Sequence, residues 1–302
     1  GYTKFDKIKV PTYLMSRWIA HSIHLPGAFR AYQGINAPKR LRVTVPHPGL
    51  GFERPWHENH EIILKWYDHW LKDINTGIMD EPPISIFVQG TNQWRYENEW
   101  PLARTRWTKF YLRKGGLLTE ELPTDNEEPD SFTYKPALRP GKEVPSVKYT
   151  TAPLTKDVEV TGPSALYLCA SLSTTDANWH IEIYDIDTDG SKRLVTMGWL
   201  KASHREVDES KSKPYQPFHT HTRSVPVEPG KIYEYPIGIV ETSNTFKAGH
   251  RIHLIIKGQD TYWEGPEYFR EIHFHLDYSE ESHQTIHHDL KYPSHLLLPV
   301  IP

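Results

Sequence analysis

The sequence predicts a short segment of alternating strands and helices, followed by a larger mostly-β sandwich. The chain has 302 residues, 37% of them hydrophobic, which is enough for two packed cores because one core seldom grows beyond roughly 250 residues. Its 25 prolines and 18 glycines suit turns between short strands. Beyond Pro82 the apolar spacing changes from helical to alternating. We therefore expect two domains, residues 1–81 and 82–302.

The first segment has the pattern of one strand-helix-strand unit. Val10–Met15 is rich in strand-forming residues, and a similar run follows at Arg40–Val45. Between them, residues 24–33 form an amphipathic stretch of helical spacing. The spacing therefore predicts a helix that connects two strands.

A second helix is predicted over residues 58–73, ending near Gly77. Aromatic side chains recur along it at helical spacing, at Trp66, Tyr67 and Trp70. Such a face is more typical of a helix that packs on a sheet than of a ligand platform. We interpret it as a packing surface.

Alternating runs such as Ile84–Val88 continue almost to the end of the chain. Two stretches are expected to be surface excursions: residues 115–146, which are dense in Pro, Glu, Asp and Gly, and residues 205–222, which have little apolar content. The many short strands indicate a sandwich. The strands expected after Val88 are 108–112, 158–161, 165–171, 180–186, 193–200, 232–240, 250–257 and 272–276.

Composition argues against several classes of partner. The 35 basic and 38 acidic residues leave a net charge of −3, too even for a nucleic-acid footprint. No run approaches the ~18 apolar residues that cross a bilayer, so no membrane partner is expected. Cys169 has no disulfide partner and lies in an apolar run, which predicts a buried, inert thiol. The start is neither an initiator methionine nor a signal peptide, so the native N-terminus is expected upstream, and no localisation is indicated.

Ordered landmarks along the C-terminal three quarters of the chain resemble those of one family. They include a Trp-Pro-Leu turn, an Asp-rich hairpin, an Ala-Gly-His-Arg stretch and a final Leu-rich segment. Their order also matches, and the resemblance is to the CocE/NonD family of cocaine-esterase-like and X-Pro dipeptidyl-peptidase serine hydrolases. The landmarks are Glu99–Arg104, Ala152–Leu154, Val158–Pro163, Asp176, Tyr184–Gly190, His204–Arg205, Glu228–Gly230, Phe246–Ile252 and Pro293–Pro299.

The resemblance implies that residues 1–81 are the end of an α/β-hydrolase domain and residues 82–302 a jelly-roll β-sandwich. In such hydrolases the triad follows the chain order serine, acid, histidine. No serine of this sequence lies in the Gly-x-Ser-x-Gly pattern of a nucleophile elbow, since Ser164 has Gly162 before it but Leu166 after it. The nucleophile is therefore expected in a missing N-terminal half.

The acid position is occupied by alanine. The family's acid closes a motif resembling Gly-Gly-Trp-Tyr-Asp-His, and the matching residues here are Ser16–His21. Ala20 stands where the aspartate is expected. An aspartate would orient the catalytic imidazole and stabilise its charged form, and a methyl group does neither. Normal triad chemistry is thus in question.

The catalytic histidine is expected after the next strand. The family's Gly-Pro-Trp-x-His stretch aligns with Thr44–Gly49, where Pro48 takes the histidine position and His47 matches after a one-residue shift. His47 is our candidate for the catalytic histidine. The alternative is that His47 is a turn histidine between two prolines. His21 and His24 are further candidates, or they flank the first helix.

Metal and cofactor signals are weak. Asp185–Gly190 matches the start of a calcium-binding loop, but the position of its last ligand falls on Thr196, which favours a hairpin turn. Two histidine pairs, His219 with His221 and His273 with His275, alternate as metal ligands sometimes do. Among 18 histidines such pairs arise by chance, so neither a metal nor a cofactor is expected.

Two functions remain open. In the first, the chain is the C-terminal part of a serine acyl hydrolase that acts on a small-molecule ester or peptide through an acyl-enzyme. In the second, it is a catalytically degenerate relative or a β-sandwich binding module. A truncated hydrolase sheet would expose an edge, so the expected partners are the N-terminal hydrolase portion of the same protein or a second copy in a homo-oligomer.

Overall fold

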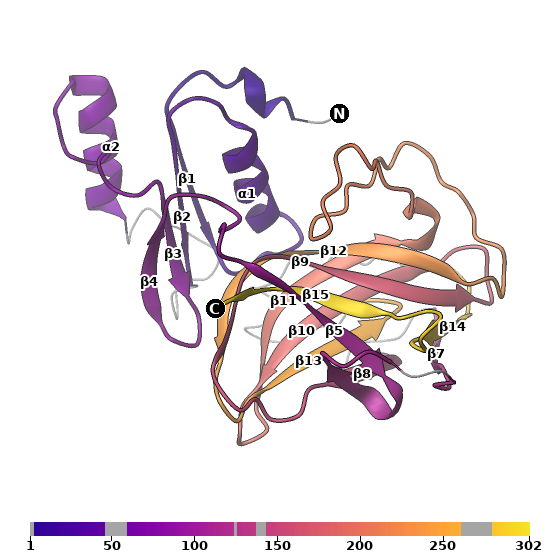
Figure 1. Ribbon diagram of the computed structural model, residues 1–302. Coiled ribbons are helices and arrows are strands. Elements are labelled where there is room, and N and C mark those ends of the chain that lie inside the picture. The colour runs from indigo at the N-terminus through magenta and orange to yellow at the C-terminus, as the bar shows by residue number, and fades with distance from the viewer. Residues whose placement is uncertain (1–2, 46–58, 124–125, 137–142, 261–279) are drawn as a thin grey trace. The chain divides into compact units, whose positions relative to one another are not determined.

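The structure is a computed structural model that describes residues 3–45, 59–123, 126–136, 143–260 and 280–302. The chain divides into two compact units, one reaching to Ala103 and the other beginning at Arg104 (Figure 1). Each unit is considered by itself below.

The first unit is a four-stranded sheet with the order β1-β2-β3-β4. Strands β1, β2 and β3 are parallel, whereas β4 is antiparallel to β3. The predicted strand-helix-strand unit and the second helix are confirmed to within two residues at each end. The elements are η1 (Phe5–Lys7), β1 (Thr12–Arg17), α1 (His24–Gly34), β2 (Lys39–Thr44), α2 (His60–Lys72), β3 (Ile84–Val88) and β4 (Gln93–Glu97).

Helix α1, which lies beside β1 in Figure 1, is anchored by aromatic stacking. Phe29 is fully buried, with ring centroids 5.9 Å from Trp18 and 4.7 Å from Trp100. The Trp18 indole N–H donates to the carbonyl oxygen of Phe87 at 2.7 Å. These contacts fix the segment that follows β1 against α1 and, across β2, against strand β3, because offset aromatic pairs add to simple burial.

Helix α2 uses only part of its predicted aromatic face for packing. Trp66 is buried, with centroids 5.3 Å from Tyr13 on β1 and 5.7 Å from Trp70. Tyr67 is 53% exposed, so the prediction is confirmed for Trp66 and wrong for Tyr67. Successive helical residues point about 100° apart, which turns Tyr67 away from the buried stripe.

The buried Arg40 of β2 holds the connection between α2 and β3. Its guanidinium donates to the carbonyl oxygens of Ile78, Glu81 and Pro82, and it pairs with the Glu81 carboxylate at 3.3 Å. By their contacts, strands β3 and β4 belong to the first unit, which reaches to Ala103. The domain boundary predicted from the change in periodicity lies earlier, between residues 81 and 82. That division stays a prediction.

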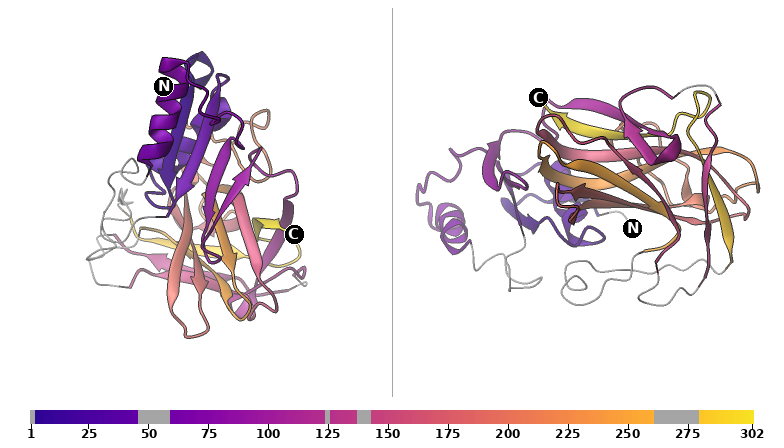
Figure 2. Two further views of the ribbon diagram at one scale, coloured as in Figure 1. Left: turned by 90° about the vertical axis from the view of Figure 1, so that its left-hand side faces the viewer. Right: turned by 90° about the horizontal axis from the view of Figure 1, so that it is seen from below.

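The second unit is built almost entirely of strands. They hydrogen-bond in the order β12-β11-β10-β13-β8-β6-β5-β15-β9-β14-β7, and β12 also pairs with β9, which closes nine of the strands into a ring. The predicted mostly-β fold is confirmed (Figure 2). The elements are β5 (Arg106–Arg113), η2 (Lys114–Gly116), β6 (Leu117–Thr119), β7 (Asp130–Tyr134), β8 (Ser146–Thr150), β9 (Val158–Leu172), β10 (Asn178–Ile186), β11 (Lys192–Lys201), η3 (Ala202–His204), β12 (Tyr233–Phe246), β13 (Arg251–Lys257), β14 (Ser282–His287) and β15 (His295–Ile301).

Strand β9 merges two strands that were predicted separately. The sequence Gly162-Pro163 reads as a break, yet β9 continues through it and pairs with β12 on one edge and with β15 and β14 on the other. Gly162 has φ +140°, and a Cβ there would lie 3.0 Å from the Cβ of Pro299. A glycine is therefore needed where the ladder shifts register, as at a β-bulge.

The core of the second unit is a single cluster of aliphatic and aromatic side chains. Trp179, Tyr149, Tyr235 and Phe246 are its largest fully buried members. The stretch 115–146, expected to be a surface excursion, contains β6 and β7, whereas the predicted strand at 272–276 lies outside the described residues.

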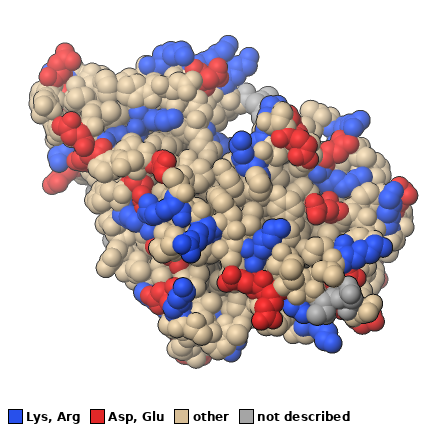
Figure 3. Space-filling view, viewed as in Figure 1, with Lys and Arg blue, Asp and Glu red and all other residues tan. Residues whose placement is uncertain are grey.

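On the face that Figure 3 shows, basic and acidic side chains are interspersed. No helix of the described residues is long and apolar enough to span a bilayer.

Candidate functional site

The carboxyl edge of the parallel sheet is where the resemblance implies that an acid and a histidine meet. Strands β1 and β2 end level with each other, because Arg17 pairs with Thr44 and the Trp18 N–H donates to the Thr44 carbonyl oxygen at 2.9 Å. Both strands therefore end at the same edge of the sheet. Ligands and catalytic groups of parallel α/β sheets commonly gather at such an edge.

Ala20 lies three residues beyond β1 and is 1% exposed. Its φ of +53° is a left-handed conformation, uncommon for a residue with a Cβ and better tolerated by aspartate or asparagine. Its carbonyl oxygen accepts hydrogen bonds from the N–H groups of Ile23 and His24, both at 3.1 Å, at the start of α1. The turn after β1 thus has a left-handed residue at the position expected for the acid, but this residue carries a methyl group in place of a carboxylate.

The three candidate histidines differ in their surroundings. His21 is buried directly after Ala20, whereas His24 is exposed on the first turn of α1. His47 lies outside the described residues, two positions after the last described residue that follows β2. The structure therefore tests none of them as the catalytic base.

Strand β2 also presents a cation at this end of the sheet. The Arg42 guanidinium lies 3.7 Å above the Trp94 ring and donates from Nε to the Asn59 side chain at 2.7 Å. Asn59 precedes the first residue of α2. The cation–π contact and the hydrogen bond hold this charge in place.

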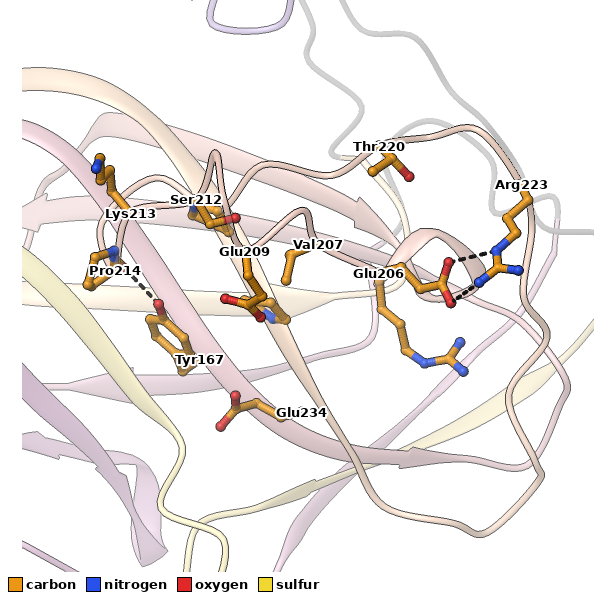
Figure 4. Close-up of a pocket in the computed structure, with 13 residues that line it drawn as sticks. Tyr167, Glu206, Val207, Glu209, Ser212, Lys213, Pro214, Thr220, Arg223 and Glu234 are labelled. Atoms are coloured by element: carbon orange, nitrogen blue, oxygen red, sulfur yellow. Dashed lines mark hydrogen bonds and ion pairs between the residues drawn. The ribbon is translucent and has the colours of Figure 1, made fainter.

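The second unit carries a separate cavity of about 680 Å³ between the 205–222 loop and the strands β9 and β12 (Figure 4). The Tyr167 hydroxyl donates to the Pro214 carbonyl oxygen at 2.8 Å and so fastens the loop to β9. Trp107 and Tyr215 stack with centroids 4.0 Å apart, which adds a second attachment. The loop is held over the cavity although it contains no helix or strand of its own.

Charges of both signs line this cavity. Arg223 donates two hydrogen bonds to Glu206, at 2.8 and 2.9 Å, and Arg205 donates to the Val225 carbonyl oxygen at 2.6 Å. Burial raises the pKa of Tyr167, and the nearby carboxylates Glu234 and Glu209 raise it further. The residues that line the cavity are Tyr167, Arg205, Glu206, Val207, Glu209, Ser212, Lys213, Pro214, Pro217, Thr220, Arg223, Glu234 and Pro236. Sequence reasoning missed this cavity, because a polar loop gives no signal of what it covers.

Two predictions from the sequence are confirmed here. Cys169 is buried, and burial, with a smaller contribution from Glu234, raises its pKa to about 11, so the thiol is inert at neutral pH. Residues 187–190 form the turn of the β10–β11 hairpin, where the Gly190 N–H donates to the Asp187 carbonyl oxygen at 3.0 Å. Asp185 is already paired with His250 and Arg193, so this segment is no calcium loop.

The comparisons with known proteins agree with this architecture. Residues 76–297 match the family described as the X-Pro dipeptidyl-peptidase C-terminal non-catalytic domain. Cocaine esterase from Rhodococcus sp. is 26% identical over 291 residues, which cover 84% of this chain and 48% of that protein. The chain spans about half the length, or less, of the curated relatives that it matches.

Solved structures share the fold. A CocE/NonD family hydrolase from Staphylococcus aureus superposes with a TM-score of 0.84 at 20% identity, covering 99% of this chain and 55% of that one. An α-amino acid ester hydrolase gives a TM-score of 0.75 at 18% identity, covering 97% of this chain and 56% of its own. The class is thus that of mostly-β C-terminal domains. The chain belongs to the family of X-Pro dipeptidyl-peptidase C-terminal non-catalytic domains.

Proposed function

We propose that this chain is the C-terminal part of a serine acyl hydrolase whose nucleophile is supplied by residues outside it. The reaction passes through an acyl-enzyme, and the substrate is a small ester or peptide. The names of the curated relatives, which include a cocaine esterase and putative Xaa-Pro dipeptidyl-peptidases, support an ester and a peptide alike. The partners proposed are that substrate and the N-terminal hydrolase portion of the same protein.

One observation carries the proposal. The parallel strands β1 and β2 end level with each other, so the turn at Ala20 leaves the sheet at the edge where β2 ends, and His47 follows the end of β2 by three residues in the sequence. In a serine hydrolase of this chain order the acid follows one strand and the histidine follows the next. The topology supports that assignment for residues 1–81 as the end of an α/β-hydrolase domain, with residues 82–302 as a jelly-roll sandwich.

A second candidate function is favoured by Ala20. The methyl group of Ala20 cannot accept a hydrogen bond from a catalytic histidine, so it cannot fix the tautomer of that imidazole. In this second function the protein is a degenerate hydrolase whose cleft binds a ligand without cleaving it. The cavity under the 205–222 loop would give such a protein a further binding surface. In this alternative the acyl-enzyme never forms.

Labelling separates the two functions. The protein purified from its natural source is treated with a fluorophosphonate, and its intact mass is measured together with the labelled peptide. Hydrolase function predicts one labelled serine in a larger or two-chain species. A full-length species that is never labelled supports the binding function instead.

Variants of the full-length protein test the triad positions. His47→Ala is expected to abolish labelling, while His21→Ala and His24→Ala retain it. Ala20→Asp is expected to raise kcat at least about tenfold, because aspartate tolerates the left-handed backbone and orients the imidazole. Ala103→Asp, at an exposed position of the same unit, is the control. Loss of labelling in His21→Ala alone would transfer the role of base to His21.

A further inference from the structure

Three histidines meet at the base of the loop that covers the cavity. His204 ends the short helix η3, just before the loop, and His219 and His221 lie at its far end. The ring centroids of His204 and His221 are 5.3 Å apart, and those of His219 and His221 are 5.8 Å apart. The fold brings these rings together where the two ends of the 205–222 loop meet, which we call the neck of the loop. Sequence spacing does not reveal this contact.

The separation of two ring nitrogens matches that of two ligands on one metal ion. Nδ1 of His204 lies 3.4 Å from Nδ1 of His221. Two nitrogens bound at about 2.05 Å to a tetrahedral zinc ion are about 3.35 Å apart. The two nitrogens lie within hydrogen-bond distance of each other, and their separation equals that of two ligands on one ion.

His219 positions the loop and is not a ligand. Its Nε2 lies 2.8 Å from the carbonyl oxygen of Pro236 on β12, and its Nδ1 lies 3.3 Å from that of Glu206. Carbonyl oxygens only accept, so the Nε2–H donates to Pro236 and fixes the ring. No group of three or more His, Cys, Asp or Glu side chains among the described residues could hold a metal ion, so the chain offers two ligands here, His204 and His221.

The backbone at His221 has an unfavourable left-handed conformation. Its φ of +50° lies in the left-handed region, which costs a residue with a Cβ free energy and is uncommon outside glycine, asparagine and aspartate. Glycine would relax this position but would remove the ring from His204. The strain accompanies a side chain that meets a partner across the neck of the loop.

We propose that His204 and His221 bind a divalent transition metal of the zinc class through their Nδ1 atoms, and that the ion fastens the loop over the cavity. Imidazole nitrogens select such borderline ions over Mg²⁺ and Ca²⁺. A link between the two ends of a loop reduces the number of open conformations of the residues between them. Metal occupancy thus regulates access to the cavity lined by Tyr167, Glu209 and Glu234.

Calorimetric titration of the metal-stripped protein with Zn²⁺ tests the site. We expect binding that excess Mg²⁺ does not displace, and we expect it to weaken at least tenfold in His204→Ala and in His221→Gly. His221→Gly relaxes the left-handed backbone, so its unfolding midpoint should not fall, which separates loss of the ligand from loss of the fold. His283→Ala, at an exposed histidine on β14, should bind as the wild type does.

Trypsin cleavage after Lys211, in the middle of the loop, provides a second readout. Zn²⁺ should slow this cleavage at least threefold in the wild type and in His283→Ala, and not at all in His204→Ala or His221→Gly. Equal Zn²⁺ affinity in all four proteins, or equal protection, would mean that the two imidazoles share only a neutral hydrogen bond. Either result would overturn the proposal.

Discussion

The interior of the β-sandwich and the loop over its cavity contain the same kinds of ion pair in opposite surroundings. Lys257 and Glu182 form a 2.5 Å pair whose side chains are 3% and 2% exposed. Arg223 and Glu206 pair at 2.8 Å on the loop, at 70% and 40% exposure. Geometry alone would rank the two pairs together, but burial separates them, because a buried charge that loses its partner has no water to replace it.

This difference indicates which parts of the molecule tolerate change. In the interior of the second unit, Lys257 of β13 pairs with Glu182 on the adjacent strand β10. The loop is held by a few side-chain contacts and by two isolated β-bridges, Val207 with His219 and Lys213 with Gln216. We expect substitutions in the sandwich to change stability and substitutions in the loop to change binding.

The largest effect is expected from Lys257→Met. The substitution leaves the Glu182 carboxylate buried without its closest cation, which should cost about 3–5 kcal/mol of unfolding free energy. Denaturant unfolding followed by tryptophan fluorescence measures it. The double variant Lys257→Met/Glu182→Leu should recover most of the loss, and Lys247→Met, at an exposed pair with Asp157, is the control. Equal effects at Lys257 and Lys247 would contradict the comparison.

The second prediction concerns pH. Burial, and then Lys192 and Lys148, lower the pKa of His253 on β13 to about 4, against about 6.5 in an unfolded chain. As the pH falls from about 6.5 to 4, the unfolded state binds a proton that the folded state does not bind, so stability should fall by about 2–3 kcal/mol. His253→Gln should lack this component, whereas the exposed His283→Gln should keep it. Identical pH profiles for both variants would refute the assignment.

A smaller effect is expected at Tyr149. Its hydroxyl donates to Asp130 at 2.8 Å, and burial, followed by the Asp130 charge, raises its pKa well above the usual value, so it remains a donor at any working pH. Tyr149→Phe should cost about 1 kcal/mol, because Asp130 keeps His288 at 3.0 Å. Tyr215→Phe on the loop is the matched control and should unfold as the wild type does. A loss in Tyr215→Phe as large as in Tyr149→Phe would remove the contrast.

The smallest effect is expected at the exposed pair. Glu206→Gln should leave the unfolding midpoint unchanged within error, both at physiological ionic strength and in 1 M salt, since water and ions already screen this contact. Thermal unfolding monitored by circular dichroism measures it. A clear drop that disappears in high salt would show that the loop contributes to the stability of the sandwich.

Much of the fold is readable from local patterns, and the departures have identifiable causes. Alternating and helical spacing located β1, α1, β2 and α2 closely. The break expected at Gly162-Pro163 did not occur, because pairing with β12 and β15 on both edges of β9 overrides the local turn signal. Strand β7 was missed because polar residues dominate it and its partner β14 is distant in sequence, whereas β6 has only three residues and is too short to show a period.

The candidate sites differ in the same way. Ala20 was recognisable from a motif, whereas its left-handed backbone was not, because alanine gives no signal of positive φ. The contact between His204 and His221 depends on how the intervening loop folds back, and alternation within His219–His221 pointed to a different pair. Local spacing predicts which residues share a face and does not predict which distant residues meet.

The position of β15 has a consequence for how the protein is made. Residues 295–301 insert between β5 and β9, so two strands from earlier in the chain have no common neighbour until this segment arrives. During synthesis the chain emerges from the ribosome in order, and non-local strand pairing is slow to form. The ring of strands therefore closes only after translation has passed Ile301, and a chaperone that shields the β5 and β9 edges would act in that interval.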